Sequence, residues 1–199
     1  MAGWAPAFLL GVATAVVLET GMGLLLFLSP GLLPALTGVL AVGLGSLASG
    51  LASVRSGPEA GVRWRWLLAA GSLVGAAVLS VGWSFQGEAG PDSWLGRGGL
   101  LAFLVALPLY SLGACLAAVA RSGAEPRPGA WAALGGAAGV LVVGLALVPR
   151  FEPFSVYLFG LMCVALSALG VVTNASSDGP GRQDPIEGGD PWALERWEP

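Results

Sequence analysis

An acidic side chain, Glu19, lies near the middle of the apolar run Phe8–Leu28, which contains no other ionisable residue. A run of this length matches the roughly 20 residues that a helix needs to cross a hydrocarbon core about 30 Å thick. A charge at that depth costs on the order of 2.5–3.5 kcal/mol on insertion scales. The carboxyl group is therefore expected to face other helices or a water-filled cavity, or to stay protonated, and Glu19 is the predicted proton- or ligand-binding residue.

Thr20 and Tyr110 are the predicted partners of Glu19, because their hydroxyl groups are suited to sharing a polar cavity with a carboxyl group. Further polar candidates within apolar runs are Thr14 and Ser84, with Pro108 as a candidate kink. A carboxyl group that binds and releases a proton or a small cation is what a coupled transporter requires. The same group held protonated would serve as a hydrogen-bond donor between helices. Both interpretations stay open.

The residue inventory excludes several other kinds of chemistry. The chain has no histidine, and its nine basic residues, all arginine, stand against twelve acidic ones for a net charge of −3. Ser-His-Asp and Cys-His catalysis and imidazole zinc sites are excluded, and a nucleic-acid-binding role has no basic surface behind it. Cys115 and Cys163 lie in separate apolar runs without metal-ligand or redox spacing, so we expect small core residues there. No enzyme activity, cofactor or metal is expected.

The composition indicates a membrane protein, with 55% hydrophobic residues and a mean hydropathy of +0.79. The runs long enough to span a bilayer are Phe8–Leu28, Leu32–Val54, Trp66–Phe85, Leu100–Ala120, Trp131–Val148 and Phe154–Val172. They are continuously apolar rather than alternating, which favours helices over a barrel. The expected fold is therefore all-α: a polytopic integral membrane protein with six transmembrane helices in residues 1–173. Since most loops are short, helices adjacent in sequence are expected to be antiparallel neighbours.

The arginines predict the orientation, because Lys and Arg concentrate in cytoplasmic loops. One side of the predicted membrane carries Arg55, Arg63, Arg65, Arg121, Arg127, Arg182 and Arg196, and the other carries Arg97 and Arg150. This split predicts both termini in the cytoplasm, with Asp92 and Trp94 outside. The tryptophans expected to act as interfacial anchors at helix ends are Trp64, Trp66, Trp83 and Trp131.

Small residues recur at helical spacing and predict where helices approach closely. The second run carries Ala41, Gly45, Ser49 and Ser53, with Gly50 alongside, and the fifth carries Gly135 and Gly139. Lipid gives helices no hydrophobic reason to associate, so small faces that let backbones approach gain dispersion contacts. We predict helix packing at Gly45, Ser49, Gly50, Gly135 and Gly139, within the chain or against another copy or protein.

The composition changes abruptly after the sixth run. Residues 174–199 are rich in Gly, Pro, Ser and Asp, with six acids against two arginines. Such a segment is typical of a disordered tail, here cytoplasmic. Its last stretch, Pro191-Trp-Ala-Leu-Glu-Arg-Trp197, is unusually aromatic for disorder, and two readings stay open for it: docking on a partner or bilayer surface, or a solvated end.

Several of these residues resemble the membrane domain that is fused to some bacterial spermidine synthases and, more distantly, the first half of a major facilitator transporter. The resemblance rests on Phe8-Leu-Leu-Gly through Glu19, on Gly45-Ser-Leu-Ala-Ser-Gly50, on Leu112-Gly-Ala114, and on the spacing of Leu134-Gly135, Gly139, Gly144 and Pro149. It covers roughly residues 8 to 170. It implies a six-helix unit in the bacterial inner membrane and small organic amines as the class of ligand.

The chain also departs from that family pattern. Ala132-Ala133 stand where the family has a polar Asn-Thr pair, and Ala117 replaces a proline. The family's cytoplasmic catalytic domain is missing, so aminopropyl transfer does not carry over. Six helices are half of the facilitator plan, which implies a homodimer with Glu19 of each copy near the axis.

Two functions therefore remain. The first is a transporter-like or small-ligand-binding membrane protein, linked to protons or cations, with Glu19 at the site. The second is a non-catalytic structural or accessory subunit that packs on another membrane protein through its small-residue faces. The sequence offers no nucleophile–base pair that would support an intramembrane enzyme. The expected partners are the lipid bilayer and either a second copy or another membrane protein, and no nucleic acid.

Overall fold

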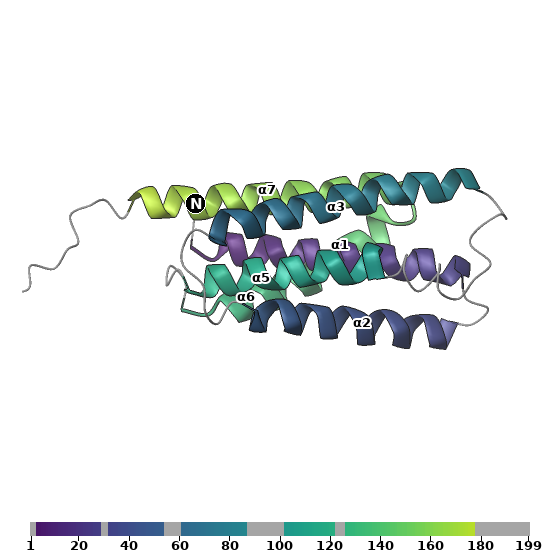
Figure 1. The fold of residues 1–199 in the computed structure, drawn as a ribbon, viewed down its shortest axis with the longest axis horizontal. Helices are drawn as coiled ribbons and strands as arrows, with labels where there is room; N and C mark the ends of the chain where they lie inside the picture. The colour runs from purple at the N-terminus through teal and green to yellow at the C-terminus, as the bar shows by residue number, and fades with distance from the viewer. Residues whose placement is uncertain (1–2, 29–31, 54–60, 87–101, 122–125, 178–199) are drawn as a thin grey trace, which may run out of the picture.

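The protein is all-helical. The computed structural model describes residues 3–28, 32–53, 61–86, 102–121 and 126–177, and no strand occurs within these ranges. The helices are α1 (Ala5–Leu28), α2 (Leu32–Ala52), α3 (Gly61–Gln86), a π-helical segment η1 (Ala102–Ala106) continued by α5 (Leu107–Arg121), α6 (Pro128–Gly139) continued by a second π-helical segment η2 (Val140–Leu147), and α7 (Pro153–Ser177) (Figure 1). The expected all-α class is confirmed, and each of the six apolar runs forms one helical segment within the described residues, with η1–α5 and α6–η2 each counted as one. α7 continues to Ser177, so residues 174–177, predicted as the start of the tail, are helical, and the rest of the predicted tail lies outside the described residues.

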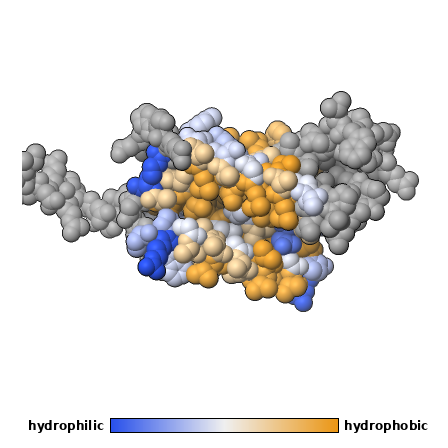
Figure 2. Space-filling model, turned by 90° about the horizontal axis from the view of Figure 1, so that it is seen from below, coloured by the Kyte–Doolittle hydropathy of each residue, from blue (hydrophilic) through white to orange (hydrophobic). Residues whose placement is uncertain are grey.

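Four helical stretches among the described residues are long and apolar enough to cross a membrane: Ala5–Leu24, Phe103–Arg121, Pro128–Leu147 and Pro153–Thr173. Two further apolar stretches, Thr37–Ala52 and Trp64–Ser80, are shorter. The face of the bundle drawn in Figure 2 is largely apolar. Among the described residues, Leu67, Leu141 and Leu145 are exposed by 64, 61 and 76%. Water-soluble proteins rarely show so much contiguous apolar surface, so this surface is suited to lipid.

α1 is the central helix of the bundle. It contacts α2, α5, α6, α7 and both π-helical segments, and α3 and α7 pack together along one side (Figure 1). Successive helices alternate in direction, as expected, but they are not each other's main neighbours. α1 packs chiefly against α6 and α7, and α2 packs chiefly against α5. The expectation of sequential neighbours therefore holds in part: α1 with α2, α3 with α5 and α5 with α6 do pack together, but they are not the main partners. Loop length limits how far apart two helix ends lie but does not choose the face that each helix buries.

The parallel helices α1 and α6 meet at their backbones. A Cβ atom added at Gly135 would overlap the carbonyl oxygen of Phe8, and one at Gly11 would overlap that of Ala132. One turn further, a Cβ at Gly139 would lie 2.7 Å from the Cβ of Ala15. No side chain fits between these helices, and the close approach gains dispersion contacts along both backbones.

The same contact occurs a second time, between the parallel helices α2 and α5. A Cβ at Gly50 would overlap the carbonyl oxygen of Tyr110, and one at Gly113 would overlap that of Leu47. The register is identical in the two pairs. The equivalent residues, the α1–α6 pair first, are Phe8 with Tyr110, Gly11 with Gly113, Ala132 with Leu47 and Gly135 with Gly50. The bundle therefore contains one helix-pair arrangement twice, the second pair running in the opposite direction (Figure 1).

The small-residue stripe predicted on α2 does not face the bundle. Gly45 and Ser49 are exposed, and a Cβ added at Gly45 would meet no described atom within 4 Å. The buried face of α2 instead holds Gly43 and Gly50, which lie against α1 and α5. The prediction that Gly45 and Ser49 pack against other helices of this chain is therefore wrong. That they pack against another molecule stays a prediction.

Charged and aromatic residues gather at one end of the bundle, which we call the arginine end. Arg65 lies near the start of α3, Arg121 ends α5 and Arg127 directly precedes α6, and these three helix ends lie together (Figure 1). Trp64 and Trp131 lie within the first turns of their helices at this end, while Arg150 follows η2 at the opposite end. The side chain of Trp83 and the predicted external residues Asp92, Trp94 and Arg97 lie outside the described residues.

Candidate functional site

Glu19 lies within α1, about 21 Å along the helix from Ala5 at 1.5 Å per residue. Its carboxyl group is half-buried and packs on the backbone of η2. A Cβ added at Gly144 would lie 3.3 Å from Oε2 and 3.4 Å from Cδ of Glu19. Within the part of the chain that the structure describes, this carboxyl group accepts no hydrogen bond and makes no ion pair. The carboxyl group therefore lies in tight contact with the backbone at Gly144, and an added Cβ would require it to shift by only a few tenths of an ångström.

The next residue, Thr20, is only 4% exposed, and its Oγ1 has no hydrogen-bond partner among the described residues. Leaving a hydroxyl group buried and unpaired costs roughly 1–3 kcal/mol, so such groups are rare in folded proteins. The other hydroxyl of this helix, Thr14, avoids that cost by donating to the carbonyl oxygen of Leu10 at 2.9 Å. Thr20 is therefore the polar group near Glu19 that has capacity to bind a further partner.

Both π-helical segments contact α1 beside these residues. Gly144 of η2 faces Glu19, and Val105 of η1 lies at Gly21, where an added Cβ would be 2.5 Å from its Cγ2. π-helical turns are rare and occur frequently at functional sites, because their wider spacing disturbs the regular i to i−4 bonding. In η2 the N–H of Val148 donates to the carbonyl oxygen of Val143 at 2.8 Å, a bond that spans five residues.

A buried tyrosine of α7 completes the polar groups at this level. The hydroxyl group of Tyr157 donates to the carbonyl oxygen of Leu104 in η1 at 3.3 Å. In a regular helix that carbonyl would accept from residue 108, which is a proline without an N–H. α7 runs antiparallel to α1 and its Gly160 packs on Val16, so Tyr157, one turn before Gly160, lies at the level of Thr20.

We refer to the Glu19 carboxyl group and the backbone of η2 at Gly144, which it contacts, as the Glu19 site. Thr20, and Tyr157 with the Leu104 carbonyl group, lie at a similar level of the bundle, and no contact joins them to the Glu19 carboxyl group among the described residues. A carboxyl group at this depth is able to accept a proton or to bind a small cation. Within the described ranges no three His, Cys, Asp or Glu side chains come together as metal ligands do. A cavity of about 200 Å³ lies one turn beyond Gly144, between the end of η2 and the start of α7; its lining residues are Leu147, Phe151, Ser155, Val156 and Phe159.

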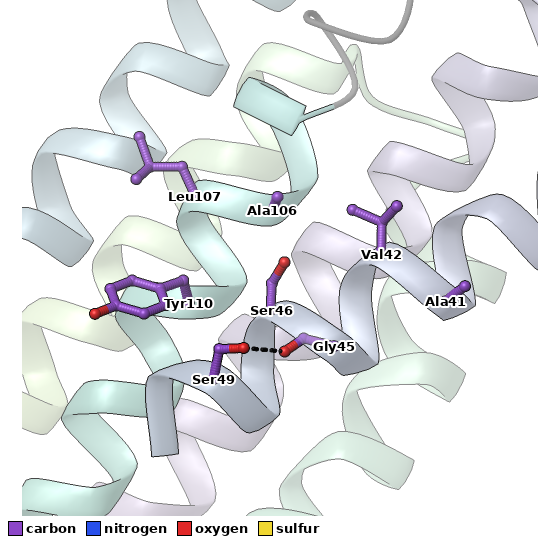
Figure 3. Close-up of a pocket in the computed structure, with 8 residues that line it drawn as sticks. All are labelled: Ala41, Val42, Gly45, Ser46, Ser49, Ala106, Leu107 and Tyr110. Carbon is purple, nitrogen blue, oxygen red and sulfur yellow. Dashed lines mark hydrogen bonds between the residues drawn. The ribbon is translucent and has the colours of Figure 1, made fainter. Parts of the chain in front are cut away.

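The third predicted site residue, Tyr110, lies elsewhere. It is half-buried on α5 and lines an open groove of about 510 Å³ between α5 and α2 (Figure 3). The groove is lined by Ala41, Val42, Gly45, Ser46, Ser49, Ala106, Leu107 and Tyr110. Glu19 and Thr20 are not among the lining residues, so Tyr110 lies apart from both; Glu19 and Thr20 are consecutive residues of α1, and their side chains point about 100° apart around the helix. The side chain of Ser84, the remaining polar candidate, lies outside the described residues.

Three buried interhelical hydrogen bonds were not anticipated from the sequence. Besides Tyr157, the hydroxyl groups of Ser72 and Ser111 lie 3.1 Å apart between α3 and α5, and Ser167 donates to the carbonyl oxygen of Pro6 at 2.8 Å. Serine and tyrosine are common within apolar runs, so the sequence does not single out these residues. A usable signal existed only for the Tyr157 bond, because Pro108 leaves a helix carbonyl group without its usual donor. Cys115 and Cys163 are buried free thiols, which confirms their place in the core.

Comparison with known proteins adds no relative. No protein-family model matches this chain, and no curated protein and no solved structure matches it. The functional argument therefore rests on the residues and on their arrangement.

Proposed function

We propose that this chain is a six-helix integral membrane protein that binds a proton or small cation at Glu19 and couples that binding to movement of a small ligand. The single observation that carries the proposal is the Glu19 carboxyl group, half-buried inside an apolar helix and packed on the π-helical backbone at Gly144. A group so costly to place at membrane depth is expected to have a function there.

The proposed location is the bacterial inner (plasma) membrane, with both termini in the cytoplasm. Its support is the collection of Arg65, Arg121 and Arg127 at one end of the bundle, since basic residues favour the cytoplasmic side. Under this topology the Glu19 site lies in the outer half of the membrane, because Gly144 is only about 9 Å of helix from Arg150 at the opposite end.

The repeated helix pair supports a transporter-like mechanism. Many transporters are built from repeats that run in opposite directions, with the binding site at interrupted helices near the repeat interface. Here the α1–α6 and α2–α5 pairs run in opposite directions, and Glu19 lies beside the two π-helical segments. Small organic amines are the proposed ligand class, because the sequence resembles the membrane domain of spermidine-synthase-like proteins. The polar pair of that domain is replaced here by Ala132 and Ala133.

The test is uptake of a radiolabelled diamine into liposomes that contain the purified protein, with an imposed pH gradient. Glu19→Gln keeps the volume and hydrogen bonding of the side chain but has no proton to exchange, so we expect a normally folded protein without coupled flux. The matched control is Glu152→Gln, which changes the same chemical group at an exposed position outside the helices. Identical flux in wild type and Glu19→Gln would contradict the proposed role.

A second function is favoured by one specific observation, the exposed small-residue face of α2. This face is a stripe of small residues, against which the backbone of a helix from another molecule is able to pack closely; its members are Ala41, Gly45 and Ser49. In this alternative the protein is an accessory subunit or a homodimer, and Glu19 is a hydrogen-bond donor between helices. Copurification of a membrane partner, lost in Gly45→Leu, together with no flux of any diamine or cation, would favour the accessory role.

A further inference from the structure

The Thr20 hydroxyl group is buried where α7 and the π-helical segment η1 both pack on α1. Val16, one turn before Thr20 on the same face of α1, packs on Gly160 of α7. Gly21, the residue directly after Thr20, packs on Val105 of η1. Thr20 therefore points toward the region between α7 and η1, where it is only 4% exposed.

Tyr157 and Leu104 bring two more oxygen atoms to this region. Tyr157 lies at the level of Thr20, and its hydroxyl group reaches from α7 to the carbonyl oxygen of Leu104, the residue before Val105. A helix directs its carbonyl groups toward its own C-terminus, and α5 runs antiparallel to α1 (Figure 1). The Leu104 carbonyl group therefore points from η1 toward the level of Thr20, and Pro108 has no N–H to occupy it.

The spacing of these oxygen atoms suits a cation better than a hydrogen bond. The hydroxyl oxygen of Tyr157 and the carbonyl oxygen of Leu104 lie 3.3 Å apart. O–H···O hydrogen bonds are usually about 2.5–3.0 Å long. A cation with metal–oxygen distances of about 2.4 Å, as Ca²⁺ has, holds two ligands at right angles about 3.4 Å apart. Na⁺ is close to Ca²⁺ in radius and carries one charge fewer, which suits neutral ligands. Thr20 Oγ1, without a partner among the described residues, is the third oxygen atom.

Glu19 supplies the negative charge that a cation at this depth needs. Residues 19 and 20 are consecutive, with Cα atoms about 3.8 Å apart, so the carboxyl group is close to the three oxygen atoms without contacting them. Across about 10 Å, at an effective dielectric constant near 20, opposite charges raise affinity by on the order of tenfold. The carboxyl group of Glu19 makes no ion pair within the described part of the chain, so it is available as this counterion.

We propose that Thr20 Oγ1, the Tyr157 hydroxyl oxygen and the Leu104 carbonyl oxygen bind one sodium ion, with the Glu19 carboxylate as its counterion. Main-chain carbonyl groups of interrupted helices serve as Na⁺ ligands in transporters. Three oxygen atoms from the chain leave further coordination positions for water or for the transported ligand. This inference rests on the proposed function and deepens it, because it names sodium as the cation that binds beside Glu19.

Sodium binding is measured on the purified full chain in detergent, without any diamine. The readouts are the Tm in NaCl, KCl and choline chloride at equal ionic strength, and equilibrium binding of radiolabelled sodium. We expect Na⁺ to raise the Tm by roughly 5–11 °C at a hundredfold excess over its Kd, and K⁺ and choline to raise it much less. Equal Tm values in the three salts, with no bound radiolabel, would overturn the proposal.

Two variants and a matched control locate the ion. Thr20→Val keeps the shape of the side chain and removes its oxygen, so it should weaken sodium binding at least about tenfold. Glu19→Gln removes the counterion but no ligand and should weaken binding by on the order of tenfold. The control is Thr14→Val, the same change on the same helix at a hydroxyl group that is already bonded to the Leu10 carbonyl oxygen, and it should keep the wild-type affinity.

The salt dependence separates loss of the ion from misfolding. In choline chloride Thr20→Val should be more stable than wild type, because the hydroxyl group that it removes is unpaired there, and in NaCl the order should reverse. Unchanged sodium affinity in Thr20→Val would overturn the proposal, and Thr20 would then hold a buried water molecule only.

Failure of the sodium site and failure of the proposed function are distinguishable. Proton-driven diamine flux that requires Glu19 but shows no sodium binding would overturn the sodium site alone. Sodium binding that Thr20→Val weakens, in a protein without flux of any diamine, would support the site and contradict the transport function.

Discussion

Gly45 and Gly50 lie on the same helix, yet alanine should have opposite effects at the two positions. At Gly50 a Cβ would overlap the backbone carbonyl oxygen of Tyr110, which has no rotamer by which to move aside, so α2 and α5 must separate. Overpacking of this kind typically costs about 1–3 kcal/mol. At Gly45 a Cβ meets no described atom within 4 Å, and alanine should stabilise the helix by up to about 1 kcal/mol.

The two substitutions should therefore differ by about 1–4 kcal/mol in the free energy of unfolding. With roughly 2–4 °C of Tm per kcal/mol for a chain of this size, the melting temperatures should be separated by roughly 2–16 °C, with Gly50→Ala the lower. The assay is the fraction of monodisperse protein that remains on size-exclusion chromatography after heating in detergent. Each variant is compared with wild type in the same detergent at the same protein concentration.

Equal melting temperatures for Gly45→Ala and Gly50→Ala would refute the assignment of the buried face of α2. The sequence predicts that Gly45→Leu is strongly destabilising, and the structure revises this for the isolated chain, because Gly45 is exposed. Gly45→Leu should leave the Tm of the monomer close to that of wild type. A loss of dimer without a loss of monomer stability would instead show that the stripe packs between two molecules.

Three further outcomes are expected. Thr20→Val removes the unpaired buried hydroxyl group at nearly constant shape, so the Tm in sodium-free buffer should rise by a few degrees while diamine flux falls; a fall in both would mean that the hydroxyl group is paired. Tyr157→Phe loses one interhelical hydrogen bond, about 0.6 kcal/mol on average in membrane interiors, and a Tm change above roughly 5 °C in the same buffer would contradict that value. Cysteines introduced at Gly188 and Ser93 should be labelled from the cytoplasmic and external faces of cells, respectively, and the reverse result would invert the topology.

Helix existence and length could be predicted from the sequence because they depend on local properties. A run of apolar residues as long as the bilayer is thick forms a helix wherever it lies, and all six runs do so here. The end at which arginines gather also follows from their order along the chain. Glu19 was found in the same way, because a carboxyl group in an apolar run stands out without any knowledge of its neighbours.

Which face each helix buries was decided by the tertiary structure. α2 is apolar around its whole circumference, with small residues on two sides, so its sequence does not distinguish the stripe of Gly45 and Ser49 from the buried Gly43 and Gly50. Water normally makes that choice by requiring one polar face, and lipid does not. The contact of Gly144 with Glu19 and the separation of Tyr110 from Thr20 depend on which helices meet, and that is set by backbone approach at glycines far apart in the chain.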